Sequence, residues 1–154
     1  MEKQQDVHLA LLANGYESGF STCWPPGSRL ILDLFEDAWR DSTGEVAERL
    51  AVSFQRARAT FVTEAPALIT EEADFPDDAP AAALLAVAME GSTAHAAWIG
   101  GDVAVLARGF ESVAETTPHT LREKYRREHP QESANLANVP NVLLRMIGPR
   151  APER

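Results

Sequence analysis

The stretch Gly91–Leu121, GSTAHAAWIGGDVAVLARGFESVAETTPHTL, decides the fold of this chain. Short runs of alanine, β-branched and aromatic residues alternate in it with glycines, which is typical of strands joined by tight turns. Gly100-Gly101 predicts a hairpin between strands over 92–99 and 102–108, because two glycines supply the positive φ that a tight turn requires. The core of the fold is therefore expected to contain antiparallel sheet.

Regular elements are also predicted on both sides of this stretch. The segment 81–89 fits a helix or a buried strand by its pattern alone. The other expected elements are strands over 7–13, 20–24, 29–35 and 110–115, helices over about 44–64 and 119–129, and an ordered segment over 138–148.

Arg29–Phe35, RLILDLF, carries the strongest strand signal in the first half of the chain. It is expected to pair with 20–24 in a hairpin across Pro25-Pro26-Gly27-Ser28. Its Asp33 would be costly to bury without a partner. Asp33 is therefore interpreted either as a residue at a sheet edge or paired with an arginine, or as part of a site.

The helix over 44–64 is predicted from apolar residues that recur every three or four positions. They are Val46, Leu50, Phe54, Ala57, Phe61 and Val62. Ser42 or Thr43 is expected to cap its first amides. The acid- and proline-rich stretch 70–80 that follows is predicted to be a solvated loop.

Composition sets the outer bounds. The 154 residues predict one domain over 1–148 with a fraying tail over 149–154. The net charge of −9 argues against nucleic acid and anionic membranes as partners. The basic cluster Arg122, Lys124, Arg126 and Arg127 is either a solvated helix face or an anion site.

Cysteine usage and hydropathy suggest a cytoplasmic protein. Cys23 is the single cysteine, so no internal disulfide can form. The first 15 residues lack the basic start and apolar run of a signal peptide. No segment approaches the roughly 18 consecutive apolar residues of a membrane span.

Five segments, taken in order, resemble the type 2C (PPM-type) metal-dependent Ser/Thr protein phosphatases. They are RLILDLF, which resembles the strand that delivers the family's Asp-Gly metal motif, followed by Gly44–Ala47, Gly91–Ala94, Thr116–His119 and Asn141–Gly148. The resemblance makes 81–89 a strand. It implies an α+β fold with antiparallel sheet packed against one long and one short helix, a shortened type 2C sandwich.

The family's chemistry, however, is altered here. The resemblance implies two Mg²⁺ or Mn²⁺ ions that activate a water for attack on phosphorus, and such hard cations need oxygen ligands. Counted back from Gly44, the Asp-Gly position falls on Glu36-Asp37 and the following Gly-Gly on Trp39-Arg40. Two large side chains would then fill the space of two glycines.

Other parts of the family's site are changed or missing. Glu17 is the sole acid of the segment NGYESGF, Gly109–Ser112 stands in place of Gly-Asp-Ser-Arg, and Pro118 replaces the Asp before the histidine. The family's later Ser-Asp-Gly and Asp-Asn segments have no counterpart after Gly148. Glu17, Glu36, Asp37 and Asp41 are expected to assemble at best one poor metal site.

The sequence therefore predicts a catalytically inactive, phosphatase-like module that binds a protein partner, in Ser/Thr phosphorylation signalling. No cofactor is expected; Mg²⁺ or Mn²⁺ would bind Glu36 and Asp37 only if activity were retained. Trp39, Arg40 and Asp41 are predicted to contact the partner, with Trp39 as an exposed aromatic in a polar loop. Replacing Trp39 with alanine is then expected to weaken binding and leave the fold intact.

Two alternatives remain open at this point. The chain could be a weak Mg²⁺- or Mn²⁺-dependent phosphatase, alone or completed by another chain, or a structural subunit of an assembly. Because the missing strands would leave apolar edges and faces uncovered, a homodimer or a dedicated partner is expected. A monomer mass that does not change with concentration would count against self-association.

Overall fold

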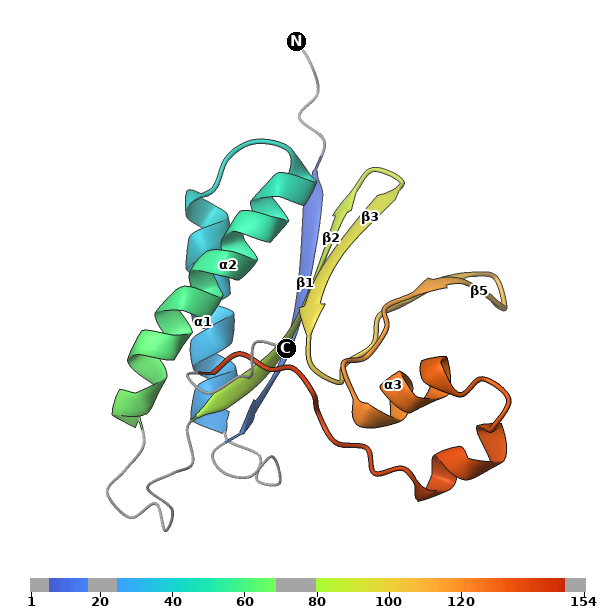
Figure 1. The fold of residues 1–154 in the computed structure, drawn as a ribbon. Helices are drawn as coiled ribbons and strands as arrows, with labels where there is room; N and C mark the ends of the chain where they lie inside the picture. Colours follow the sequence, from blue (N-terminus) through green and yellow to red (C-terminus); the bar gives the residue numbers. More distant parts are fainter. Residues whose placement is uncertain (1–5, 17–24, 69–79, 149–154) are drawn as a thin grey trace.

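The computed structural model describes residues 6–16, 25–68 and 80–148 and packs two helices on one face of an antiparallel sheet (Figure 1). The elements are β1 (Val7–Tyr16), α1 (Pro25–Asp41), α2 (Val46–Glu64), the 3-10 helix η1 (Ala65–Leu68), β2 (Ala81–Glu90), β3 (Thr93–Ile99), β4 (Val105–Arg108), β5 (Glu111–Glu115), α3 (Leu121–Glu128) and the 3-10 helix η2 (Ser133–Asn138). The expected strand over 20–24, the acidic stretch 70–79, the tail 149–154, Glu17 and Cys23 lie outside the described residues.

The main sheet has three strands in the order β1-β2-β3, all antiparallel. Leu11 of β1 lies opposite Ala86 of β2, which lies opposite Ala97 of β3. Directly opposed residues share a face of a sheet, and this face packs against α1 and α2. A separate two-stranded ribbon of β4 and β5 projects away from the sheet, near α3.

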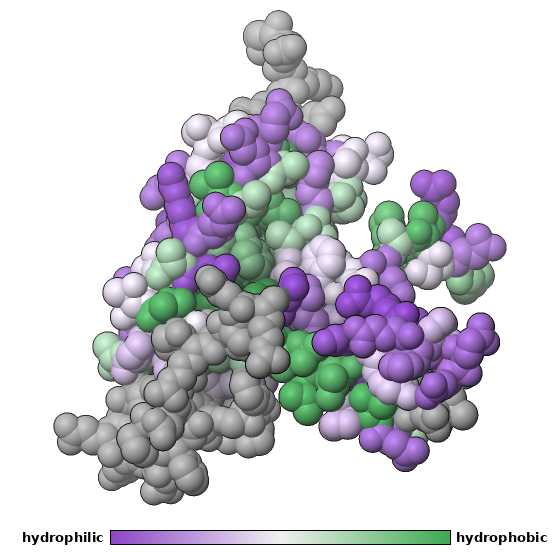
Figure 2. Space-filling model, in the orientation of Figure 1, coloured by the Kyte–Doolittle hydropathy of each residue, from purple (hydrophilic) through white to green (hydrophobic). Residues whose placement is uncertain are grey.

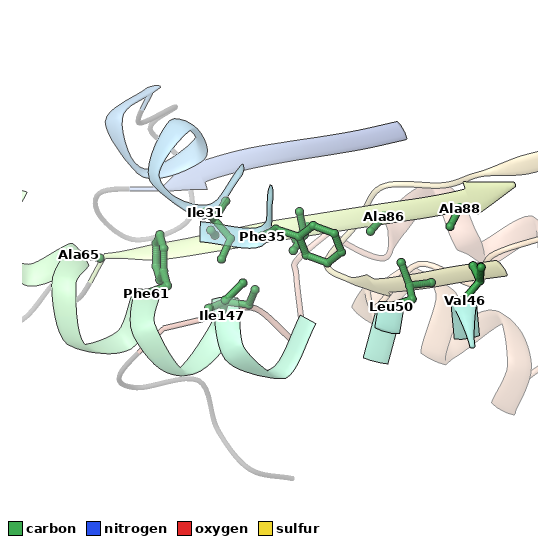
Figure 3. Close-up of a cluster of buried hydrophobic side chains, with 12 residues drawn as sticks. Ile31, Phe35, Val46, Leu50, Phe61, Ala65, Ala86, Ala88 and Ile147 are labelled. Atoms are coloured by element: carbon green, nitrogen blue, oxygen red, sulfur yellow. The ribbon is translucent and has the colours of Figure 1, made fainter. Parts of the chain in front are cut away.

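The core lies between the two helices and this sheet face. Figure 3 shows Ile31 and Phe35 of α1, Phe61 of α2 and Ile147 of the C-terminal segment gathered in one cluster, and all four are fully buried. Burying an apolar side chain of this size contributes about 1.5–3 kcal/mol. The interaction of α1 and α2 with the sheet is therefore what holds the fold together.

The C-terminal segment pairs with the first residues of β2, which extend beyond the end of β3. Ile147 exchanges two backbone hydrogen bonds with Ala82, at 2.7 and 2.8 Å. Farther back, Leu143 forms a bridge with Thr120 at the start of α3. The expectation of an ordered segment over 138–148 is confirmed, and its order comes from strand-like pairing rather than from a helix.

The strand expected at RLILDLF is wrong, because these residues lie within helix α1. Ile31 and Phe35 are four residues apart and fully buried, whereas Asp33 is exposed and 4.0 Å from Arg29. Prolines are favoured in the first turn of a helix, where the missing N–H has no helical partner anyway. Pro25-Pro26 therefore begins α1 instead of turning a hairpin.

The long helix predicted over 44–64 is confirmed as α2, but its capping is not as expected. Its N-cap residue is Glu45, which makes no side-chain cap hydrogen bond. The Ser42 hydroxyl instead bonds the Trp39 carbonyl oxygen at 3.0 Å and lies 3.3 Å from the Ser53 hydroxyl. Ser42 therefore joins the end of α1 to the middle of α2.

The hairpin expected at Gly100-Gly101 is also wrong. β3 pairs with β2 across Gly91-Ser92, and β4 pairs with β5 across Gly109-Phe110. Gly100 ends β3 with φ +118°, and its N–H and C=O both bond to His119. These two glycines therefore separate the sheet from the β4–β5 ribbon.

The α+β fold class with antiparallel sheet is confirmed. The segment 81–89 is a strand, residues 111–115 form the expected further strand, and α3 is the expected short helix. Within the described ranges, no helix has the length and apolar character needed to cross a membrane.

Candidate functional site

The ends of β1 and β3 are joined by a hydrogen bond between two polar side chains. Asn14 lies near the end of β1, and Asp102 follows β3 by three residues. The Asn14 Nδ2 donates to Asp102 Oδ1 at 2.8 Å. The second carboxylate oxygen, Oδ2, is buried and has no hydrogen-bond partner among the described residues. This pair places a partly buried carboxylate against an amide.

Burial raises the pKa of Asp102 above its ordinary value of 3.8, and the hydrogen bond from Asn14 offsets part of this rise. The Asp102 carboxyl group therefore loses its proton at a lower pH in the unfolded chain than in the folded one. Because of this difference, the free energy of unfolding falls as pH rises from about 3.8 through the raised pKa. Above that window the ionised carboxylate keeps its full desolvation cost.

Replacing Asp102 with asparagine is therefore expected to raise the melting temperature at pH 7 by about 1–2 °C, because solvent screening of this half-exposed group leaves at most about 0.5 kcal/mol of the desolvation cost. The new amide oxygen can still accept from Asn14, while the buried charge is gone. Below pH 3.8 the gain should vanish, because Asp102 is then neutral as well. Thermal melts at both pH values check this, and an equal gain at both would contradict it.

The residues predicted as metal ligands lie elsewhere. Glu36 and Asp37 are exposed on the last turns of α1, and Asp37 Oδ1 accepts from Arg40 Nη1 at 2.7 Å. Asp41 is exposed at the end of the same helix. In Figure 1 the connection from α1 to α2 lies at the end of the sheet where β1 begins, whereas Asn14 lies toward the other end. The fold does not bring Glu36 and Asp37 to Asn14 and Asp102.

Trp39 does not lie in a polar loop, and that expectation is wrong. It is a half-buried residue of α1 whose ring stacks on Phe35 at 6.5 Å between centroids. The Arg49 guanidinium of α2 lies 4.1 Å from the Trp39 ring. Its packing against the core means that Trp39→Ala should also destabilise the fold, contrary to the expectation from sequence.

The side chains of the described residues do not form a divalent metal centre. Mg²⁺ and Mn²⁺ sites use about six oxygen ligands, several of them carboxylates. Within the described ranges, no three His, Cys, Asp or Glu residues come together in a way that could hold a metal ion. At the Asn14–Asp102 pair the amide directs its N–H toward one carboxylate oxygen, which is then used by a donor within the protein.

A second polar feature lies on the other side of Gly100. A pocket of about 680 Å³ opens between β3, α3 and the C-terminal segment. We call it the basic pocket; its lining includes Trp98, His119, Lys124, Arg127 and Arg145.

The wall of the basic pocket formed by Trp98 and His119 is built by several contacts. The two rings stack at 6.1 Å between centroids with an angle of 16°, and Trp98 Nε1 donates to the Thr117 carbonyl oxygen at 2.8 Å. The Gly100 N–H donates to His119 Nδ1 at 3.3 Å. In a neutral imidazole the proton is then on Nε2. Both rings are thus fixed in orientation.

Burial lowers the pKa of His119, and the positive charges of Arg145 and Arg127 lower it further. The imidazole is therefore neutral at pH 7. The effect also indicates that the two guanidinium groups, from segments far apart in the sequence, act on the same small volume. Glu128 is the one acidic residue in the pocket lining.

The basic pocket was not identified from the sequence as a site. Lys124 and Arg127 were visible as members of a basic cluster, which left an anion site open as an alternative. Arg145 belongs to a different segment, and only folding brings it to them. The spacing of residues on one helix could therefore indicate Lys124 and Arg127, but not the contribution of Arg145.

The structure is similar to those of solved Ser/Thr phosphatases. The match to the Mycobacterium tuberculosis phosphatase PstP/Ppp has a TM-score of 0.68 at 16% identity and covers 97% of this chain and 63% of that one. The match to the S. agalactiae Ser/Thr phosphatase has a TM-score of 0.69 at 19% identity and covers 98% of this chain and 61% of that one. The PstP catalytic domain has also been solved in complex with two manganese ions, with a TM-score of 0.65 at 17% identity over 93% of this chain and 59% of that one.

This chain therefore has the fold of the PPM-type Ser/Thr phosphatases and spans about three fifths of the length of these structures. No protein-family profile matches the sequence. No curated protein matches it either.

Proposed function

We propose that this domain, with its PPM-type phosphatase fold, is a catalytically inactive module that binds a protein partner, in Ser/Thr phosphorylation signalling. The observation that carries the proposal is the Asn14–Asp102 pair: an amide and a carboxylate hydrogen-bond to each other at 2.8 Å at the end of the sheet, with no cluster of metal-binding side chains around them in the described ranges.

The order of elements supports assigning this pair to the altered metal centre. The resemblance places the family's Asp-Gly motif after a strand and before the first long helix, and RLILDLF is not that strand. The described strand that precedes α1 is β1, which ends in Asn14-Gly15-Tyr16. We therefore assign the family's Asp-Gly position to Asn14-Gly15 in place of Glu36-Asp37, and on this assignment the position carries an amide instead of a negative charge.

The order of elements also changes the assignment of the family's Gly-Asp motif. Gly109-Phe110 forms the exposed turn between β4 and β5, so it is unsuited to a metal centre. Gly101-Asp102 is the one Gly-Asp pair in the sequence and begins two residues after the end of β3. We assign the family's Gly-Asp to these two residues in place of Gly109-Phe110. One carboxylate of the centre is then retained and its neighbour is replaced by an amide.

Exposed apolar side chains support binding to a protein. The β4–β5 ribbon carries Val105, Leu106, Phe110 and Val113, all exposed, and Phe110 at its turn is fully exposed. Figure 2 shows hydrophobic atoms gathered on this projecting part of the molecule. Exposed apolar patches on soluble domains mark interaction surfaces. The ribbon is therefore our proposed contact for a partner or a second copy, and a concentration-independent monomer mass would contradict the second.

A turnover measurement tests the loss of catalysis. With Mn²⁺ or Mg²⁺ present, the wild-type domain is expected to hydrolyse p-nitrophenyl phosphate no faster than buffer, because the described residues bring together too few oxygen ligands to hold the ions. Metal-dependent turnover above background would overturn the proposal and favour the weak phosphatase.

Asn14→Asp is the matched variant for this measurement. It restores a second carboxylate beside Asp102, so Mn²⁺ should raise its melting temperature more than that of the wild type. Without metal, the lost amide donor and the like charges should cost about 1–3 kcal/mol of stability. Equal responses of the two proteins to Mn²⁺ would count against Asn14 as the residue that disables the site.

A further inference from the structure

We infer that the basic pocket binds an oxyanion carried by a peptide, either a phosphate group or the carboxylates of acidic side chains. Lys124 and Arg127 of α3 and Arg145 of the C-terminal segment supply the charge, and Trp98 and His119 supply a fixed wall. The pocket shares no residue with the Asn14–Asp102 pair, so the inference holds whether or not the domain is an enzyme.

The charge distribution around α3 distinguishes an anion site from a solvated basic helix. Arg126 donates to both carboxylate oxygens of Glu123, at 2.8 and 2.9 Å, and Arg122 donates to the Val139 carbonyl oxygen at 3.1 Å. These two arginines are occupied within the protein. The helix therefore uses half of its basic residues to support its own packing and presents the other half to the pocket.

The cations of the basic pocket have no such partners. None of the ion pairs among the described residues includes Lys124, Arg127 or Arg145. Folding brings these three cations together with a single acidic residue of the pocket lining, Glu128, so the pocket keeps an excess of positive charge in a chain whose net charge is −9. Grouped, unpaired cations repel one another, and an anion that bridges them removes this cost.

The shape and remaining lining suit a peptide. Pockets that bind small groups enclose about 300–1,000 Å³, are largely apolar and carry a few polar groups. The pocket of about 680 Å³ falls in this range, and Pro118, Leu143 and Leu144 line it beside Trp98. The anionic group can bond the guanidinium forks, which match phosphate and carboxylate geometry, while the neutral His119 can donate through Nε2.

The experiment titrates the full chain with four probes, followed by the indole N–H signal of Trp98 in NMR. The probes are inorganic phosphate, a phosphoserine peptide, the same peptide with two glutamates in place of the phosphoserine, and the unmodified serine peptide. The phosphoserine peptide or the glutamate peptide, or both, should bind and shift the Trp98 signal, and the serine peptide should not. Binding should weaken as salt is raised, because exposed charges are screened.

Variants identify the site. Arg127→Gln with Arg145→Gln should weaken anionic-peptide binding at least about tenfold, because two charge-assisted contacts are removed. Arg56→Gln with Arg58→Gln is the control: it removes an equal charge at two exposed positions of α2. Lys124→Gln, at another exposed position, gives a milder second test if the double variant does not fold.

The outcomes separate the two sources of the anion. Binding of the phosphoserine peptide alone assigns the pocket to phosphate, and binding of both anionic peptides assigns it to oxyanions in general. Binding of the glutamate peptide alone assigns it to acidic segments. The inference is overturned if neither anionic peptide shifts the Trp98 signal, even where inorganic phosphate does, or if Arg56→Gln with Arg58→Gln weakens binding as much as the double pocket variant.

Discussion

Replacing Gly100 with alanine should destabilise the domain by roughly 2–6 kcal/mol, as the sum of backbone strain and overpacking. Gly100 has φ +118°, a conformation that residues with a side chain rarely adopt. An added Cβ would lie 2.3 Å from the Cβ of Ala83 and 3.2 Å from its Cα, on the neighbouring strand β2. Neither Ala83 atom can move without displacing the strand.

Gly109→Ala is the matched control for this change. Gly109 also has a positive φ, +65°, but no heavy atom lies within 4 Å of a Cβ at that position. Its cost should be limited to the backbone term of about 1–2 kcal/mol. Urea unfolding of both variants measures the difference. Equal losses would mean that the close approach of Gly100 to β2 does not constrain the fold.

Phe35→Ala should cost about 3–5 kcal/mol, a large share of the stability of an ordinary domain. Phe35 is fully buried in α1, where its ring meets the edge of Phe54 of α2 at 6.4 Å between centroids. Removing the ring leaves a cavity between the helices and the sheet.

Leu68→Ala serves as the control because it also truncates a large apolar side chain to alanine, but at a position that is 44% exposed. Its cost should stay near 1 kcal/mol or below, since little area is returned to water. Thermal unfolding followed by circular dichroism compares the two variants. If Phe35→Ala lost no more than Leu68→Ala, the α1–α2–sheet cluster would not be the main source of stability.

How far the fold could be predicted depended on how local its signals are. The stripe from Val46 to Phe61 identified α2 because the period of a helix is repeated four times there. RLILDLF is too short for periodicity to separate a buried strand from a buried helix, and Pro25-Pro26 fits both a turn and a helix start. The strand interpretation of α1 failed for that reason.

The error in α1 also displaced the candidate site. If RLILDLF is a strand, the family's metal motif falls on Glu36-Asp37. In the structure these two residues lie toward the C-terminal end of α1. Asn14 and Asp102 are 88 residues apart in the sequence, and no local pattern joins them. The predicted hairpin across Gly100-Gly101 was wrong for a similar reason. The two glycines resemble a turn in the sequence, whereas in the structure Gly100 allows a close approach to β2.

Calorimetric titration of Mn²⁺ into the wild-type protein, with p-nitrophenyl phosphate turnover followed in parallel, tests the central claim most directly. The Asn14–Asp102 pair offers an amide and one carboxylate where a divalent ion needs several charged oxygen ligands. We expect no binding heat and no metal-dependent turnover. Micromolar binding accompanied by turnover would contradict the account and make this chain a metal-dependent phosphatase.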